Sequence, residues 1–292
     1  IAAVVLVLAA AAGASGDASP LAFASPASGS PGVRPTAALP QVVLPQGPGA
    51  LAPSFARFTE APPAGARPSA GDGLADVEGC AGCHADAADQ WRTSAHAFAS
   101  FNNPVYRASV DRYRDEVGPK ASRFCGGCHD PSLMADGAMD GPVAPEDPRA
   151  HAGVTCLTCH GITAARPDGN GSFDLSLAPK AMPREGDAAS VVAHKRAMAP
   201  APLRSADLCG SCHRVFLDAG SGNPHFLPGQ DDLLPWARSA YAGSHGERVD
   251  PGVPLQQCRD CHMAKEPAPL GDVAAKEGRI ASHRFLGGHT YL

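Results

Sequence analysis

Aromatic residues are scarce in this chain of 292 residues: Phe, Trp and Tyr make up 5% of it, and only two tryptophans occur. Aromatic rings normally supply much of the apolar surface that a domain buries. A chain of this size usually builds a side-chain core with sizeable helices or sheets. The shortage of rings indicates that side chains alone fill little of the interior.

A strong net charge and a long apolar run are also missing. The net charge of −5 gives no indication of nucleic-acid binding. The apolar run at residues 1–12 would form a helix of about 18 Å, shorter than the roughly 30 Å core of a bilayer. Residues 1–14 are instead typical of part of a secretory signal peptide, with an uncleaved anchor as the alternative. We therefore expect a periplasmic or extracellular location.

Residues 15–73 are rich in Pro, Ala, Gly and Ser and carry few charges. Such a tract does not propagate a helix or a sheet, so we expect a flexible leader. Short apolar pieces such as residues 41–44 could dock on the following domain or on a partner. That domain is predicted to span residues 74–292, and we expect the natural chain to continue beyond it.

All ten cysteines belong to one repeated motif, Cys-x-x-Cys-His. The five copies are Cys80, Cys83 and His84; Cys125, Cys128 and His129; Cys156, Cys159 and His160; Cys209, Cys212 and His213; and Cys258, Cys261 and His262. On a helical turn, positions i, i+3 and i+4 lie on one face. Both thiols and the imidazole can therefore address one flat ligand.

Three kinds of site compete for this motif. A disulfide scaffold does not explain the histidines. Structural zinc needs two thiol pairs per ion, and five pairs leave one over. Covalent haem c uses both thiols as thioethers and the histidine as axial ligand. Since the chain has 12 histidines, five chance placements directly after a pair have a probability of roughly 10⁻⁷. The motif therefore predicts five covalently bound haem c groups with His84, His129, His160, His213 and His262 as proximal ligands.

The remaining pattern predicts a mainly α fold with extensive loops, little or no β-sheet and a core formed by packed haems. Residues 86–101 and 190–198 have helical composition, while residues 142–148, 167–183 and 221–235 are typical of loops. No alternation typical of a strand stands out. We therefore expect short helices joined by loops that contain Gly and Pro.

Seven histidines lie outside the motifs and are candidates for the sixth iron ligand. The favoured candidates are His96, His151, His194, His283 and His289, while His225 and His245 rank lower because they lie among Gly and Pro. If one helix joins His84 to His96, the two imidazoles are about 18 Å apart along its axis. They cannot bind the same iron, so His96 would serve a neighbouring haem. This predicts a packed cluster of haems.

Several stretches together resemble one family: "CAGCHADAADQWRTSAHA", "GVTCLTCHG", "CRDCHM" preceded by "PWARSAYAGS", and "SHRFLGGHT". Residues 74–292 are similar to multihaem c-type cytochromes related to the tetrahaem electron acceptor of hydroxylamine oxidoreductase. The resemblance implies a mainly helical multihaem cytochrome c fold, closely stacked haem pairs and bis-histidine ligation of most irons. It supports His96, His151 and His283 as distal ligands.

This chain departs from that family in two ways. It has five motifs where the electron acceptor has four haems. In addition, Trp236-Ala-Arg-Ser-Ala-Tyr241 echoes Trp91-Arg-Thr-Ser-Ala-His96 with a tyrosine in place of the histidine. The phenol could pack against the fold and bond to a propionate, or stand beside an open iron.

Saturated irons favour an exported pentahaem electron carrier over an enzyme. Its expected partners are redox proteins or a membrane electron-transfer complex, and self-association through haem-rich surfaces is a further option. The alternative is a multihaem oxidoreductase that acts on a small nitrogen or sulfur compound at one five-coordinate haem. A tethering module without redox function would not need five haems.

Overall fold

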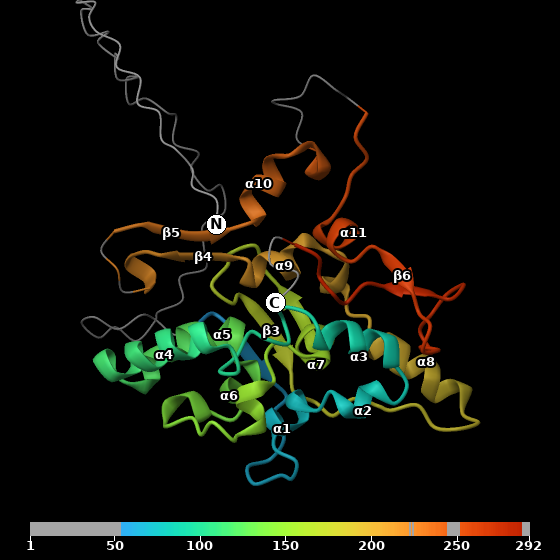
Figure 1. The fold of residues 1–292 in the computed structure, drawn as a ribbon, viewed down its shortest axis with the longest axis horizontal. Helices are drawn as coiled ribbons and strands as arrows, with labels where there is room; N and C mark the ends of the chain where they lie inside the picture. Colours follow the sequence, from blue (N-terminus) through green and yellow to red (C-terminus); the bar gives the residue numbers. More distant parts are fainter. Residues whose placement is uncertain (1–53, 222, 224, 244–251, 288–292) are drawn as a thin grey trace, which may run out of the picture. The chain divides into compact units, whose positions relative to one another are not determined.

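The computed structural model describes residues 54–221, 223, 225–243 and 252–287 (Figure 1). The α-helices are α1 (Ala70–Ala75), α2 (Glu78–Ala81), α3 (Ala85–Arg92), α4 (Pro104–Val117), α5 (Arg123–His129), α6 (Pro131–Ala135), α7 (Cys156–Gly161), α8 (Ala188–Ala197), α9 (Ala206–Cys212), α10 (Leu233–Arg238) and α11 (Cys258–His262). Six 3-10 turns lie between them: η1 (Pro119–Ser122), η2 (Ala138–Asp140), η3 (Pro148–His151), η4 (Ala201–Arg204), η5 (Ala219–Ser221) and η6 (Ala240–Ala242). The mainly helical fold with extensive loops is confirmed. None of the helices in these ranges is both long and apolar enough to cross a bilayer.

The helices are short because capping residues, glycines and prolines end them. Asn103 caps α4 by accepting hydrogen bonds from the backbone N–H groups of Val105 and Tyr106. The same helix ends at Gly118, whose φ of 92° takes the chain out of the helical conformation. α4 has 14 residues, whereas the helices that carry the cysteine motifs have four to seven.

Strands of three to five residues form three small sheets. They are β1 (Arg57–Thr59), β2 (Ile162–Ala165), β3 (Phe173–Ser176), β4 (Arg214–Leu217), β5 (Leu227–Asp231), β6 (Lys265–Pro267) and β7 (Arg279–Ala281). β3 lies between β1, which is parallel to it, and β2, which is antiparallel. β4 pairs with β5 and β6 with β7, both antiparallel. Strands this short show too few alternations to be recognised from sequence.

Two of the predicted loops are therefore wrong in part. Residues 167–183 contain β3, and residues 221–235 contain β5 and the start of α10. The predicted leader extends to residue 73, but β1 lies within it and α1 crosses its boundary. In β1, Arg57 pairs with Asp174 of β3 at 2.6 Å, a partner that composition alone does not reveal. Residues 1–53, with the expected signal peptide and most of the leader, lie outside the described ranges.

The helix expected over residues 86–101 is shorter than predicted. α3 ends at Arg92, and Thr93 and Ser94 close it with backbone hydrogen bonds to Gln90 and Trp91. Residues 94–101 then continue in turns, so one helical axis does not join His84 to His96. The helix expected over residues 190–198 is confirmed by α8.

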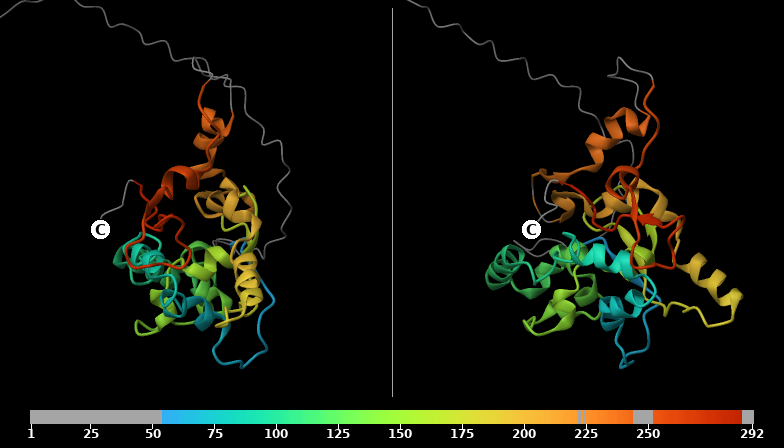
Figure 2. Two further views of the ribbon diagram at one scale, coloured as in Figure 1. Left: turned by 90° about the vertical axis from the view of Figure 1, so that its right-hand side faces the viewer. Right: turned by 45° about the vertical axis from the view of Figure 1, so that its right-hand side comes forward.

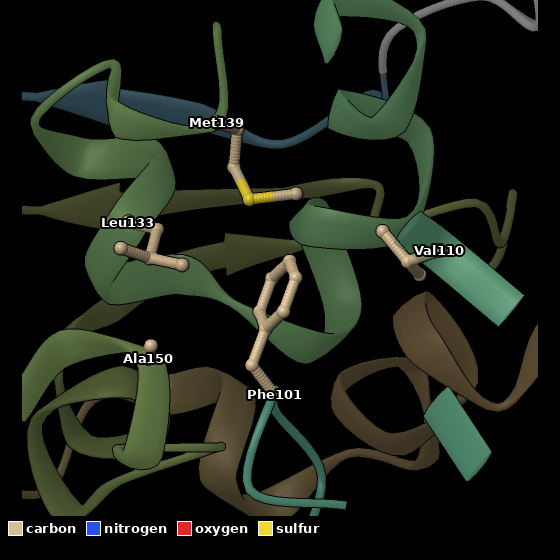
Figure 3. Packing of buried hydrophobic residues seen from close by; sticks show 5 residues of the cluster. All are labelled: Phe101, Val110, Leu133, Met139 and Ala150. Carbon is tan, nitrogen blue, oxygen red and sulfur yellow. The ribbon is translucent and has the colours of Figure 1, made fainter. Parts of the chain in front are cut away.

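The side-chain core consists of two small clusters in the described residues. One contains Phe101, Val110, Leu133, Met139 and Ala150 (Figure 3), and the other contains Leu74, Ile162, Phe173 and Leu175. The first joins α4, α6, η2 and η3, while the second packs α1 against the sheet of β1, β2 and β3. Neither cluster includes a motif histidine, but Cys125 packs against the first cluster, and Leu157 and Cys212 pack against the second.

Candidate functional site

Each Cys-x-x-Cys-His motif is built on a short helix. The second to fifth motifs lie in or at the end of α5, α7, α9 and α11, and the first begins in α2. In the first motif His84 closes the turn, since its backbone N–H donates to the carbonyl of Cys80 at 2.9 Å. All ten cysteines are free thiols. The two thiols and the imidazole of each copy thus share one local frame, as their spacing predicts.

The five motif imidazoles share one feature: the ring nitrogen Nδ1 is held by an oxygen of the protein. The pairs are His84 with Asp272 Oδ1 at 3.0 Å, His129 with the carbonyl of Ala99 at 2.7 Å, His160 with that of Met198 at 2.5 Å, His213 with Asp232 Oδ2 at 3.1 Å, and His262 with the carbonyl of Leu286 at 2.5 Å. Such a partner fixes the tautomer with its proton on Nδ1 and leaves the lone pair on Nε2. That lone pair is what a metal ion binds.

Two of these partners are carboxylates, and they differ in exposure. The side chain of Asp272 is fully buried, and it also accepts backbone N–H groups from Ala87 and Ala274. The side chain of Asp232 is 63% exposed. The pKa of Asp272 lies below its usual value despite burial, because the two backbone donors and His84 favour the charged form. His84 therefore faces a dehydrated negative charge.

Thiols from different motifs lie next to each other. Cys80 interacts with Cys156, Cys128 with Cys212, and Cys209 with Cys258. These pairs join the first motif to the third, and the fourth motif to the second and the fifth. Cys159 of the third motif also interacts electrostatically with Cys212 of the fourth. The five attachment points thus form one cluster.

His96 is the distal candidate with the most restrictive surroundings. Its Nδ1 is buried without a hydrogen-bond partner. Burial, with a smaller contribution from His213, lowers the pKa of His96 to about 4. The ring centroids of His96 and His213 are 6.0 Å apart. A neutral imidazole thus lies beside the fourth motif, and the role of His96 as a distal ligand of a neighbouring haem stays a prediction.

His194 and His283 also lie near motif histidines. His194, on α8, has its ring 6.4 Å from that of His84 with an interplanar angle of 15°, while its Nδ1 lies 2.9 Å from the carbonyl oxygen of Ala181. His283 has its Nδ1 2.9 Å from the carbonyl of Ala281. Burial, followed by the nearby charge of His160, lowers the pKa of His283. Both distal candidates keep Nε2 free.

The other distal candidates are placed differently. His151 is exposed, and its Nε2 lies 2.6 Å from the carbonyl oxygen of Pro145, so the structure does not bring it to a motif histidine. His225 is exposed beside β5. His289 and His245 lie outside the described residues.

Sequence reasoning missed the polar groups around the second motif. Tyr106 stacks on His129 with ring centroids 4.4 Å apart. Its hydroxyl donates to buried Asp130, which also accepts from Ser100. Burial raises the pKa of Asp130 to about 6. Asp232 and Asp272 were missed as well, because their distance from the motif histidines in sequence gives no signal of contact.

These residues fit haem c. A metal–imidazole bond is about 2 Å long, so two imidazoles on opposite sides of one iron have ring centroids roughly 6 Å apart. The His96–His213 and His84–His194 spacings agree with this value. In these two pairs the rings of His213, His84 and His194 each have a hydrogen-bond partner at Nδ1, which leaves Nε2 for iron. The Nδ1 of His96 has no such partner. Free thiols next to each imidazole would supply the thioether links.

Comparison with known proteins finds similarity over part of the chain. Residues 79–161 match the family model described as "Cytochrome c554 and c-prime". A penta-haem cytochrome c552 from Thermochromatium tepidum is 26% identical, with a TM-score of 0.35. The aligned region covers 74% of this chain and 58% of that structure. No curated protein matches.

The family match spans the first three motifs, and the same motif recurs at Cys209 and Cys258 with the same arrangement of thiols and imidazole. A relation to partners of hydroxylamine oxidoreductase is not part of this match. Over residues 79–161 the chain is thus similar to multihaem c-type cytochromes, and all five motifs carry the residue types that bind haem c covalently.

Proposed function

We propose that the chain carries five haem c groups and acts as an exported electron carrier between redox partners. The proposal is supported mainly by the hydrogen bonds of the five motif imidazoles. Each has Nδ1 bound to a protein oxygen, which leaves Nε2 for the iron. Haem supplies the redox chemistry when bound, while the chain attaches it, orients its ligands and sets its surroundings.

Bis-histidine ligation is proposed for the first and fourth motifs. The pairs are His84 with His194, and His213 with His96. An iron with two imidazoles has no position for a substrate, which favours electron transfer over catalysis at these sites. The contacts between motifs support transfer within the cluster, because neighbouring attachment points keep the haems close together.

Three measurements on protein from an exporting host test the proposal. Intact mass should exceed the polypeptide mass by five haems, and fractionation should recover the protein outside the cytoplasm. Low-temperature electron paramagnetic resonance of the oxidised protein should then show mainly low-spin iron. Fewer than five haems would contradict the count. A dominant high-spin signal would instead favour the oxidoreductase alternative, and a cytoplasmic holoprotein would contradict export.

A further inference from the structure

The segment that carries the first and third motifs is repeated in the structure by the segment that carries the fourth and fifth. In the first segment, Trp91 Nε1 donates to the carbonyl of Val154 at 2.7 Å, and the backbone N–H of Val154 donates to the carbonyl of His96 at 2.9 Å. Val154 stands two residues before Cys156. These two bonds fix the His96 turn against the start of α7.

The second segment makes the same two bonds. Trp236 Nε1 donates to the carbonyl of Gln256 at 2.8 Å, and the backbone N–H of Gln256 donates to the carbonyl of Tyr241 at 2.9 Å. Gln256 stands two residues before Cys258. Trp236, Tyr241 and Gln256 therefore occupy the places of Trp91, His96 and Val154.

Two further contacts extend the correspondence. Ser94 and Ser239 each close the turn after their tryptophan, with their backbone N–H 2.9 Å from its carbonyl. The first cysteine of the earlier motif interacts with the first cysteine of the later motif in both segments, Cys80 with Cys156 and Cys209 with Cys258. One module of two motifs and a tryptophan-anchored turn thus occurs within residues 80–160, where the second motif lies between its parts, and again at residues 209–262.

The two modules differ at the residue that the turn presents. In the first module this residue is His96, which is buried against His213 of the second module. In the second module it is Tyr241, which is 47% exposed, and the neighbouring Leu255 is 72% exposed. Gly153, the residue of the first module that corresponds to Leu255, is buried. Among the described residues, the surface that lies against another motif in the first module is therefore exposed in the second.

We infer that the Tyr241 end of the second module is a docking surface for a haem-bearing redox protein. The repeat indicates what fits there, because the same position of the first module lies against a haem-binding motif. A phenol in place of the imidazole gives contact without the strong axial bond that a histidine would form, which suits a transient encounter. Figures 1 and 2 show that α10, which carries Trp236, projects from the rest of the described fold.

Docking at this surface would bring a partner to the fifth motif, since α11 follows Gln256 directly. One electron would pass from a ferrous haem on one protein to a ferric haem on the other, with no bond made or broken.

The inference rests on the proposed attachment of haem. Every variant is therefore first shown to carry the same haem content as the wild type, and loss of haem from the wild type itself would contradict the proposed function before docking is tested.

The first test measures electron transfer from the reduced holoprotein to an oxidised monohaem c-type cytochrome by stopped-flow absorbance. Tyr241→Asp and Leu255→Asp should each lower the second-order rate constant at least fivefold, because each places a charge in the docking surface. Val105→Asp is the matched control, since Val105 is 74% exposed on α4 and the change in net charge is the same. An unchanged rate in the two test variants, or an equal fall in all three, would overturn the inference.

The second test asks whether residue 241 occupies an axial-ligand position. Tyr241→His holoprotein is titrated with a ferric haem peptide that has one open axial site, and low-spin conversion of the peptide is followed. We expect at least tenfold tighter binding than for the wild type. Leu234→His is the control, because it places an imidazole on α10 at a position that is 38% exposed in the wild type. Equal binding by both histidine variants would contradict the equivalence of the modules.

Discussion

At the scale of single residues, the motif histidines differ in the hydrogen-bond partner of their Nδ1 atom. A carboxylate makes an imidazole a stronger donor than a backbone carbonyl does, and a stronger donor stabilises the ferric state. His84 and His213 have carboxylate partners, whereas His129, His160 and His262 have carbonyls. With haem bound, we therefore expect the potentials to differ among chemically identical motifs.

The buried carboxylate of Asp272 should lower the potential of the first-motif haem. Asp272→Asn keeps the shape of the side chain but removes its charge, so we expect that potential to rise by roughly 60 mV, a tenfold change in a one-electron equilibrium. Potentiometric titration followed by electron paramagnetic resonance measures it. Asp232→Asn is the control, because water screens the exposed Asp232. Equal shifts in both variants would argue against a role for burial.

Replacement of His96 should open one iron. His96→Gly leaves a space beside His213, so we expect a new high-spin signal from about one haem per molecule, and added imidazole should restore the low-spin state. His151→Gly should leave the spectrum unchanged, since His151 bonds to Pro145 at the surface. A fully low-spin spectrum in the His96 variant would rule out the proposed pair.

At the scale of elements, close backbone contacts hold the ligand-bearing turns. Gly153 has φ of 60°, and a Cβ there would lie 2.2 Å from the carbonyl oxygen of His96. Gly153→Ala should therefore cost more than the roughly 1–2 kcal/mol of the backbone conformation alone, because the His96 turn must also move. Gly65→Ala is the control, with φ of 83° and open space around it.

The measurement for this pair is the free energy of unfolding of each holoprotein in guanidinium chloride. We expect Gly153→Ala to lose at least twice as much as Gly65→Ala. A high-spin signal in the Gly153 variant would show that the displaced turn carries His96 away from its iron. Equal losses in the two variants would mean that the close approach to His96 has no energetic consequence.

Sequence could predict those elements whose chemistry is local. The motif helices follow from the spacing of the thiols and the imidazole, and α8 follows from composition. β1 and β3 could not be predicted, because three or four residues show no period and their pairing joins residues 57–59 to residues 174–176. The role of Asp272 depends on a contact across 188 residues, which no local pattern encodes. The similarity between residues 91–96 and 236–241 can be seen in the sequence. The two hydrogen bonds that each of these turns makes to the residue two before a cysteine cannot be predicted from it.

At the scale of the whole molecule, the packed haems should determine whether the chain folds. The two side-chain clusters contain five and four buried residues, too few for a chain of this length to remain folded on apolar burial alone. A variant with all ten cysteines changed to alanine should therefore lose most of its helical signal in far-ultraviolet circular dichroism. Native helix content in that variant would contradict a haem-formed core.

Asp272, the carboxylate that faces the first motif, has a further consequence for biogenesis. It follows His84 by 188 residues, so synthesis delivers the earliest thiol pair long before the group that completes its electrostatic surroundings. The haem site of the first motif therefore reaches its final electrostatic surroundings only after a much later segment of the chain has folded against it. An electron donor that meets the chain before this late segment has folded back encounters a more oxidising centre than the finished protein presents.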